Sequence, residues 1–145
     1  MANVQCPQAP MASAGDQQPT SDGVGLSSEW RRGAMVVRVS GEVDASNVHH
    51  LTGLLRRSDG DARPLVLDLT RVDFFAAHCT RILFELAEER RHLHANWALV
   101  PGRVVARLLR VSDPEGLLPT ADSADQALQN FSVSERPSLL LQLAS

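Results

Sequence analysis

The chain has 145 residues, a formal net charge of −3 and a pI near 5.9, and 43% of its residues are hydrophobic. This length fits one domain with its own core, and the slight acidity gives no electrostatic reason to expect a nucleic-acid partner. No apolar run approaches the roughly 20 residues of a membrane helix, and the N-terminus lacks the basic and apolar regions of a signal peptide, so we expect a cytoplasmic protein.

The first 23 residues are polar and aperiodic, rich in Gln, Pro, Ser, Ala, Asp and Gly. Such a composition buries too little surface to offset the entropy of ordering, so residues 1–23 are predicted to be a disordered N-terminal tail. Cys6 in this tail is expected to be a free thiol, because its context differs too much from that of Cys79 to suggest a disulfide framework.

A hydrophobic pattern then predicts a hairpin followed by a helix. Residues 24–30 and 35–40 are expected to form two strands around a tight glycine-containing turn, and the valines of the second strand suit a pleated surface. Apolar residues recur at helical spacing over 48–55. Asp44 or Ser46 is expected to cap this helix.

The centre of the chain is an apolar run that leads into a polar segment and a second helix. Residues 65–69 have the pattern of a strand buried on both faces. The polar residues 70–73 are predicted to form an elbow, and a helix is expected over 77–92. Working residues commonly lie where a central strand feeds a helix, because the N–H groups of the first helical turn are free there.

Strands and helices continue to alternate after this point. We expect strands at 96–100 and 117–120, helices at 102–111 and from 122 or 123 to 128, and a tail over 132–145. The order predicts one α/β domain over 24–131. Its sheet should be mixed and mostly parallel, with four to five strands begun by a hairpin and covered by about four helices.

Three motifs of this domain resemble the STAS domain of bacterial anti-anti-sigma factors, also called anti-sigma factor antagonists. The first is Gly41-Glu-Val-Asp-Ala45, similar to the Gly-Glu-Leu-Asp box at the end of the family's early strand. The second is the apolar strand 65–69 with Thr70, Val72 and Phe74. The third is Val100-Pro101 with Val104 and the stretch 107–111. In this order and spacing, they imply a STAS-like fold over most of the chain.

The resemblance implies a binding module without catalytic activity or cofactor, acting as a monomer or weak dimer. Family members dock, when unphosphorylated, on an anti-sigma factor with a GHKL-type kinase fold and so free the sigma factor. The kinase then phosphorylates a Ser or Thr at the start of the second main helix. The added charge of about −1.5 to −2 breaks the complex.

The sequence departs from the family at this phosphorylation motif. The family has Asp-Ser-Ser-Gly or Asp-Ser-Thr-Gly, with the phosphoacceptor third. Aligned on the two phenylalanines, these positions are occupied here by Ala76, Ala77, His78 and Cys79. The acceptor position is therefore His78, which has no hydroxyl, and Thr80 lies two positions further, about 200° around the helix. The usual Ser/Thr phosphoswitch is predicted to be absent.

In the family, the loop after the early strand lines the same partner-facing edge as the start of the second helix. The predicted partner-binding residues are Asp44, Ser46, Asn47, Phe75, Ala76, Ala77, His78, Cys79 and Thr80.

Several alternatives remain open for these residues. Cys79 is expected either to pack as a small apolar residue or to act as a redox switch. His78 is a surface residue at the partner interface, a buried or hydrogen-bonded structural residue, or in principle a phosphorylated one, although a Ser/Thr kinase of the family is not expected to modify it. Consecutive helical side chains point about 100° apart, which argues against a Cys–His nucleophilic pair. Neighbouring histidines lack the spacing of a metal site, so no metal is expected.

Two other functions are weighed against the regulatory one. The protein could be a STAS scaffold subunit of a sensory complex that has lost binding in a sigma-factor pathway. Alternatively, it could be a redox-responsive regulator that uses Cys79. No Gly-x-Gly-x-x-Gly motif follows a predicted strand, which argues against a dinucleotide-binding enzyme.

Overall fold

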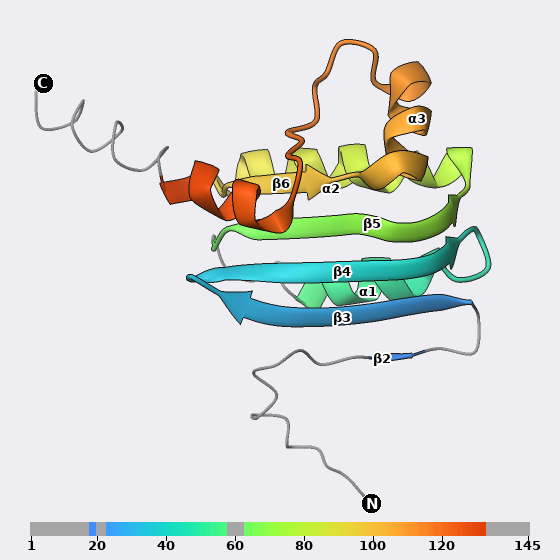
Figure 1. The fold of residues 1–145 in the computed structure, drawn as a ribbon, viewed down its shortest axis with the longest axis horizontal. Helices are drawn as coiled ribbons and strands as arrows, with labels where there is room; N and C mark the ends of the chain where they lie inside the picture. Colours follow the sequence, from blue (N-terminus) through green and yellow to red (C-terminus); the bar gives the residue numbers. More distant parts are fainter. Residues whose placement is uncertain (1–17, 20–22, 58–62, 133–145) are drawn as a thin grey trace, which may run out of the picture.

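A five-stranded mixed sheet lies at the centre of the computed structural model, which describes residues 18–19, 23–57 and 63–132 (Figure 1). Its strands, in order across the sheet, are β2 (Gln18–Pro19), β3 (Val24–Arg31), β4 (Ala34–Val43), β5 (Leu65–Phe75) and β6 (Trp97–Val100). β2, β3 and β4 pair antiparallel, whereas β4, β5 and β6 pair parallel. The prediction of a hairpin followed by parallel strands is confirmed.

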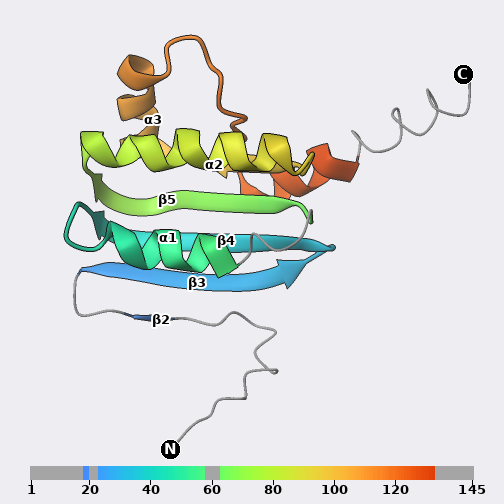
Figure 2. The ribbon, with the colours of Figure 1, turned by 180° about the vertical axis from the view of Figure 1, so that it is seen from behind.

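Helices lie on both faces of this sheet. They are α1 (Val48–Arg57), the short 3-10 helix η2 (Ala77–Thr80), α2 (Arg81–His92), α3 (Gly102–Ser112) and a last helix over 124–132. α1 and α2 cover one face, and the last helix covers part of the opposite face (Figures 1 and 2). None of the helices in the described ranges combines the length and apolar character that a membrane span requires.

The two faces of the sheet carry cores of different size. Beneath α1 and α2, apolar residues of β3, β4, β5 and β6 pack with Leu51, Leu83 and Leu86 of the helices. On the opposite face, a smaller core joins the strands to the last helix through Val36, Val66, Ala98, Ala127 and Leu128. Neighbouring residues of a strand face opposite sides, which is why the apolar run predicted at 65–69 supplies both cores.

The polar segment 70–73 is not an elbow outside the strand, as predicted, but part of β5. β4 extends to Val43, and β5 keeps pairing with it as far as Phe75. Two register shifts absorb the extra residues of β5, one between Arg38 and Ser40 of β4 and one between Gly41 and Glu42. Bulges of this kind let polar residues face outward without ending the strand.

Smaller differences concern the ends of other elements. Gln18 and Pro19, within the predicted tail, pair with β3 as a two-residue edge strand.

Residues 117–120 do not form the predicted strand. Thr120 makes an isolated bridge with Leu99, and the N–H of Leu99 donates to the carbonyl oxygen of Pro119 at 2.7 Å. The last helix runs through residue 132, further than predicted. The rest of the predicted tails, including Cys6, lies outside the described residues.

Candidate functional site

The carboxyl ends of β4 and β5 meet at one edge of the sheet. The N–H of Ala76, just after β5, donates to the carbonyl oxygen of Val43 at the end of β4, at 2.9 Å. Because the two strands are parallel and adjacent, the segments that follow them lie side by side. The loop 44–47 and the helix η2, which together hold most of the predicted site residues, are therefore neighbours.

Hydrogen bonds within the loop after β4 fix its shape. The Oδ1 of Asp44 accepts from the N–H of Ser46 at 2.9 Å and from its hydroxyl at 2.6 Å. The Oδ1 of the buried Asn47 accepts from the N–H of Asp44 at 2.9 Å, while its Nδ2 donates to the carbonyl oxygen of Glu42 at 2.8 Å. The loop therefore presents Asp44 in a defined position.

Asp44 caps the turn that begins α1, in keeping with the prediction, because its side-chain oxygen accepts from the N–H two residues further along the chain. The first helical N–H, that of Val48, donates to the carbonyl oxygen of Asp44 at 2.9 Å. The side-chain and backbone hydrogen bonds from Ser46 lower the pKa of the Asp44 carboxyl, and the nearby His78 lowers it slightly further. Asp44 thus places a negative charge at this edge beside His78.

The start of the second helical segment exposes two residues and covers the next two. Ala77 and His78 of η2 are exposed, whereas Cys79 and Thr80 are buried. The Thr80 hydroxyl donates to the carbonyl oxygen of Ala77 at 2.7 Å. The hydroxyl that follows the family's phosphoacceptor position most closely in sequence is therefore covered and already hydrogen-bonded.

Cys79 lies in the larger core with only 2% of its surface exposed. Burial raises the pKa of its thiol, and the charge of Asp44 raises it further. A protonated, covered thiol is a poor nucleophile and a poor target for oxidation. These features favour a packing role for Cys79 and count against the redox alternative.

The structure brings all nine predicted site residues to this edge, but their exposure differs. Four can meet a partner directly: Asp44, Ser46, Ala77 and His78. Five are buried and lie beneath the exposed residues: Asn47, Phe75, Ala76, Cys79 and Thr80.

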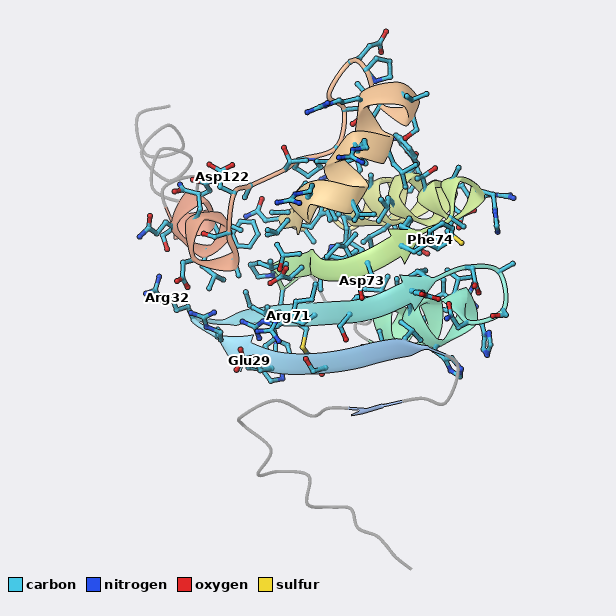
Figure 3. The ribbon with its side chains drawn as sticks, turned by 45° about the vertical axis from the view of Figure 1, so that its right-hand side comes forward. Glu29, Arg32, Arg71, Asp73, Phe74 and Asp122 are labelled. Atoms are coloured by element: carbon cyan, nitrogen blue, oxygen red, sulfur yellow. The ribbon has the colours of Figure 1, made fainter. Side chains whose placement is uncertain are left out.

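Phe74 is an exposed residue of this edge that the sequence reasoning did not include in the site. Its side chain is 50% exposed, whereas that of the adjacent Phe75 is 2% exposed (Figure 3). Adjacent residues of a strand point to opposite faces, so a buried Phe75 implies an outward-facing Phe74. This alternation in the sequence could have identified Phe74 as the exposed phenylalanine.

The histidines do not assemble a metal site. The rings of His49 and His50 lie 4.1 Å apart on α1. Within the ranges that the structure describes, no three His, Cys, Asp or Glu residues are grouped so that they could hold a metal ion.

Comparison with known proteins identifies the family of this chain. Residues 26–119 match the family model described as "Mlab, STAS domain". Osmosensory protein A of Mycobacterium tuberculosis H37Rv is 32% identical over 118 residues, which cover 77% of this chain and 75% of that protein. The anti-sigma-F factor antagonist RsfA of the CDC 1551 strain is 26% identical over 114 residues, covering 76% and 89%.

The fold is also found among solved structures. An anti-sigma factor antagonist from Mycobacterium paratuberculosis superposes with a TM-score of 0.69 and 24% identity, covering 78% of this chain and 97% of the other. The predicted fold class is confirmed by this likeness. The chain belongs to the STAS domain family, and its relatives there include anti-sigma factor antagonists.

Proposed function

We propose that this protein is an anti-sigma factor antagonist that binds an anti-sigma factor of the GHKL kinase type and thereby releases a sigma factor. The relative RsfA, named an anti-sigma-F factor antagonist, supports this activity. Such a regulator acts by binding in the cytoplasm and catalyses no reaction of its own.

The proposed docking surface is the edge formed by Asp44, Ser46, Phe74, Ala77 and His78. The observation that carries the proposal is the juxtaposition of exposed apolar side chains with one fixed charge. Phe74 and Ala77 give apolar area, and Asp44 is held by its bonds to Ser46. Aromatic residues contribute a large share of binding energy at protein interfaces.

We further propose that this docking is not switched off by Ser/Thr phosphorylation. The phosphoacceptor position is occupied by His78. Thr80 is buried, and its hydroxyl donates a hydrogen bond to the carbonyl oxygen of Ala77. A kinase would have to unwind η2 to reach it. The resulting regulator would stay bound to its partner for as long as both are present.

Incubation with ATP and each GHKL-type anti-sigma factor of the same organism tests both parts of this proposal. We expect a stable complex by size-exclusion chromatography and no added phosphate by intact-protein mass spectrometry. A matched variant, His78→Ser, restores a hydroxyl at the acceptor position and is the control for kinase activity. Stoichiometric phosphorylation of the wild-type chain would contradict the absence of a switch, and failure to bind any of these kinases would contradict the partner.

A scaffold role in a sensory complex is the second candidate, because the relative at 32% identity is named Osmosensory protein A. The same edge would then dock on a different protein. Affinity purification of the tagged chain from its own cells separates the two functions. Recovery of an anti-sigma factor supports the first, and recovery of a larger assembly without one supports the second.

A further inference from the structure

Part of the sheet face opposite α1 and α2 is not covered by any helix in the described ranges. The last helix packs on Ala34, Val36 and Val66, at one end of this face. Toward the other end, β3, β4 and β5 lie bare in Figure 1. Parallel strands are usually covered on both faces, so a bare region that includes the β4–β5 pair is unusual.

Side chains of three strands form a pocket of about 80 Å³ in this bare region. The strand register places Gly25 opposite Ser40, and Ser40 opposite Arg71. Ser27 and Arg38 lie opposite each other one row further along. All five residues line the pocket, and Figure 3 shows Arg71 over β4.

Gly25 lines the pocket directly opposite Ser40. Its φ is not among the positive values of the chain, so its backbone conformation does not require glycine. A Cβ at this position would lie 2.5 Å from the Oγ of Ser40. A side chain at position 25 would therefore have to displace the Ser40 hydroxyl within the pocket.

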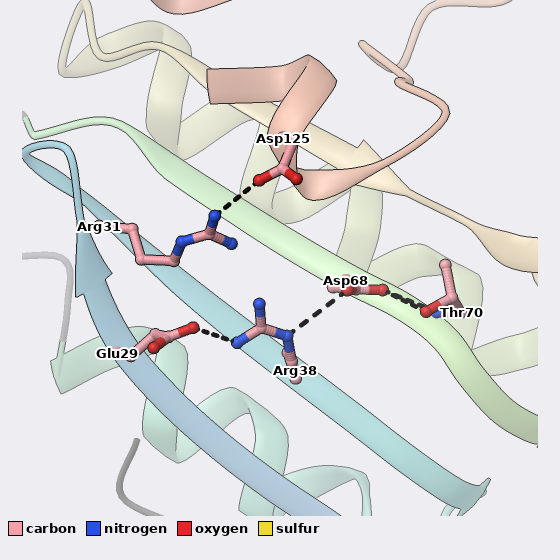
Figure 4. Close-up of polar contacts among 6 residues, drawn as sticks. All are labelled: Glu29, Arg31, Arg38, Asp68, Thr70 and Asp125. Carbon is pink, nitrogen blue, oxygen red and sulfur yellow. Dashed lines mark hydrogen bonds and ion pairs between the residues drawn. The ribbon is translucent and has the colours of Figure 1, made fainter. Parts of the chain in front are cut away.

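The two arginines of the pocket differ in their partners. Arg38 donates from Nη1 to Glu29 at 2.5 Å, and its Nε lies 3.7 Å from the Oδ2 of Asp68 (Figure 4). Arg71 is exposed and forms no ion pair with any residue that the structure describes. Two carboxylates thus compensate Arg38, whereas none from the described ranges compensates Arg71.

Unused hydrogen-bond donors lie next to this charge. Within the described part of the chain, neither the Ser27 hydroxyl nor the Ser40 hydroxyl takes part in a side-chain hydrogen bond. A guanidinium group presents a fork of N–H donors that matches the oxygens of a carboxylate or phosphate. The pocket volume of about 80 Å³ accommodates one such group.

We propose that this pocket binds a small oxyanion, a phosphate or carboxylate group, through Arg71 and the hydroxyls of Ser27 and Ser40. The site is on the sheet face and shares no residue with the docking edge, so it does not depend on the proposed function. Because Glu29 and Asp68 offset Arg38, directed donors rather than net charge hold the anion, and binding is expected to be weak.

Titration of the ¹⁵N-labelled full chain with sodium phosphate, and separately with sodium acetate, tests the proposal by NMR. The ionic strength is held constant with sodium chloride, since screening alters the interactions of exposed charges. We expect saturable amide shifts at Gly25, Ser27, Ser40 and Arg71 with at least one anion. Saturation by phosphate alone identifies a tetrahedral oxyanion as the ligand, and saturation by acetate identifies a carboxylate.

Three variants show whether the pocket is responsible. Arg71→Ala should weaken binding about tenfold, the loss expected for one hydrogen bond to a charged group. Gly25→Ala should weaken anion binding comparably without changing the charge. If the Gly25→Ala variant does not fold, Ser40→Ala takes its place. Arg107→Ala makes the same charge change on α3 and should leave the affinity unchanged. The absence of saturable shifts, or equal weakening by R107A and R71A, would overturn the proposal.

Discussion

The two halves of β5 differ in almost every physical respect. Residues 65–69 are buried except for Asp68, and this half pairs with both β4 and β6. Residues 70–75 pair with β4 alone, through two register shifts, and expose Thr70, Arg71, Asp73 and Phe74. The first half of β5 thus contributes mainly to the core, and the second half contributes mainly to the surface.

The difference shows how one strand can serve both stability and recognition. In the second half, the buried residues recur at every third position, as Leu69, Val72 and Phe75. A regular strand would bury every second residue on one face. The bulges therefore anchor this half to the core while turning more of its side chains outward.

The largest expected effect is a loss of stability after substitution in the first half of β5, compared with a substitution in the second half. Leu67 is fully buried, so Leu67→Ala should lower the free energy of unfolding by about 2–5 kcal/mol. Phe74→Ala removes a larger side chain that is half exposed and should cost about 1 kcal/mol or less. Urea denaturation measures both. Equal losses would show that the two halves do not differ as described.

The junction between the halves is tested at Gly102, where α3 begins on the backbone of β5. Its φ is +71°, and a Cβ there would lie 2.7 Å from the Cα of Thr70. Gly102→Ala should therefore destabilise the protein by about 2–4 kcal/mol, from backbone strain and overpacking together.

Gly53 on α1 provides the matched control, since a Cβ there meets nothing within 4 Å. Gly53→Ala should stabilise the protein by about 0.5–1 kcal/mol, through helix propensity. If both glycines tolerate alanine equally in thermal or urea unfolding, the close approach of α3 to β5 is not rigid.

A third test separates the contribution of the second half of β5 to binding from its contribution to stability. Phe74→Ala should weaken binding to the anti-sigma factor about tenfold, because it removes an exposed aromatic side chain from the docking edge. Its unfolding transition should remain close to that of the wild type. Calorimetric titration gives the affinity, and an unchanged affinity would exclude Phe74 from the interface.

The smallest effect concerns pH and the loop beside the second half of β5. Because hydrogen bonds lower the pKa of Asp44 below its ordinary value of 3.8, its carboxylate stabilises the fold above that pH. This contribution should be lost as the pH falls through the lowered value. Asp44→Asn should therefore be less stable than wild type at pH 7, and the gap should narrow below about pH 4. A gap independent of pH would contradict this role.

The sequence predicted the first half of β5 well, because continuous burial leaves a plain apolar pattern. It did not predict the second half as strand, since Thr70, Arg71 and Asp73 have the composition of a turn. Whether such residues extend a strand depends on the partner strand and its bulges, which a local pattern does not contain. The pocket at Gly25, Ser40 and Arg71 was missed for the same reason, because it depends on the register of three strands.

The candidate edge was predicted from a resemblance of motifs, and the structure adds which side chains reach its surface. The sequence placed Phe75 in the surface, whereas strand alternation puts Phe75 in the core and Phe74 outside. Burial of Cys79 and Thr80 also depends on how η2 sits against the core, and residue types alone do not specify that.

The affinity of a His78→Glu variant for the anti-sigma factor tests the central claim most directly. This substitution adds negative charge beside Asp44, within the proposed docking surface. His92→Glu makes the same substitution at the far end of α2, roughly 20 Å along the helix. We predict that H78E weakens binding at least about tenfold while H92E binds like wild type. Equal affinities of the two variants would contradict the assignment of this edge as the docking surface.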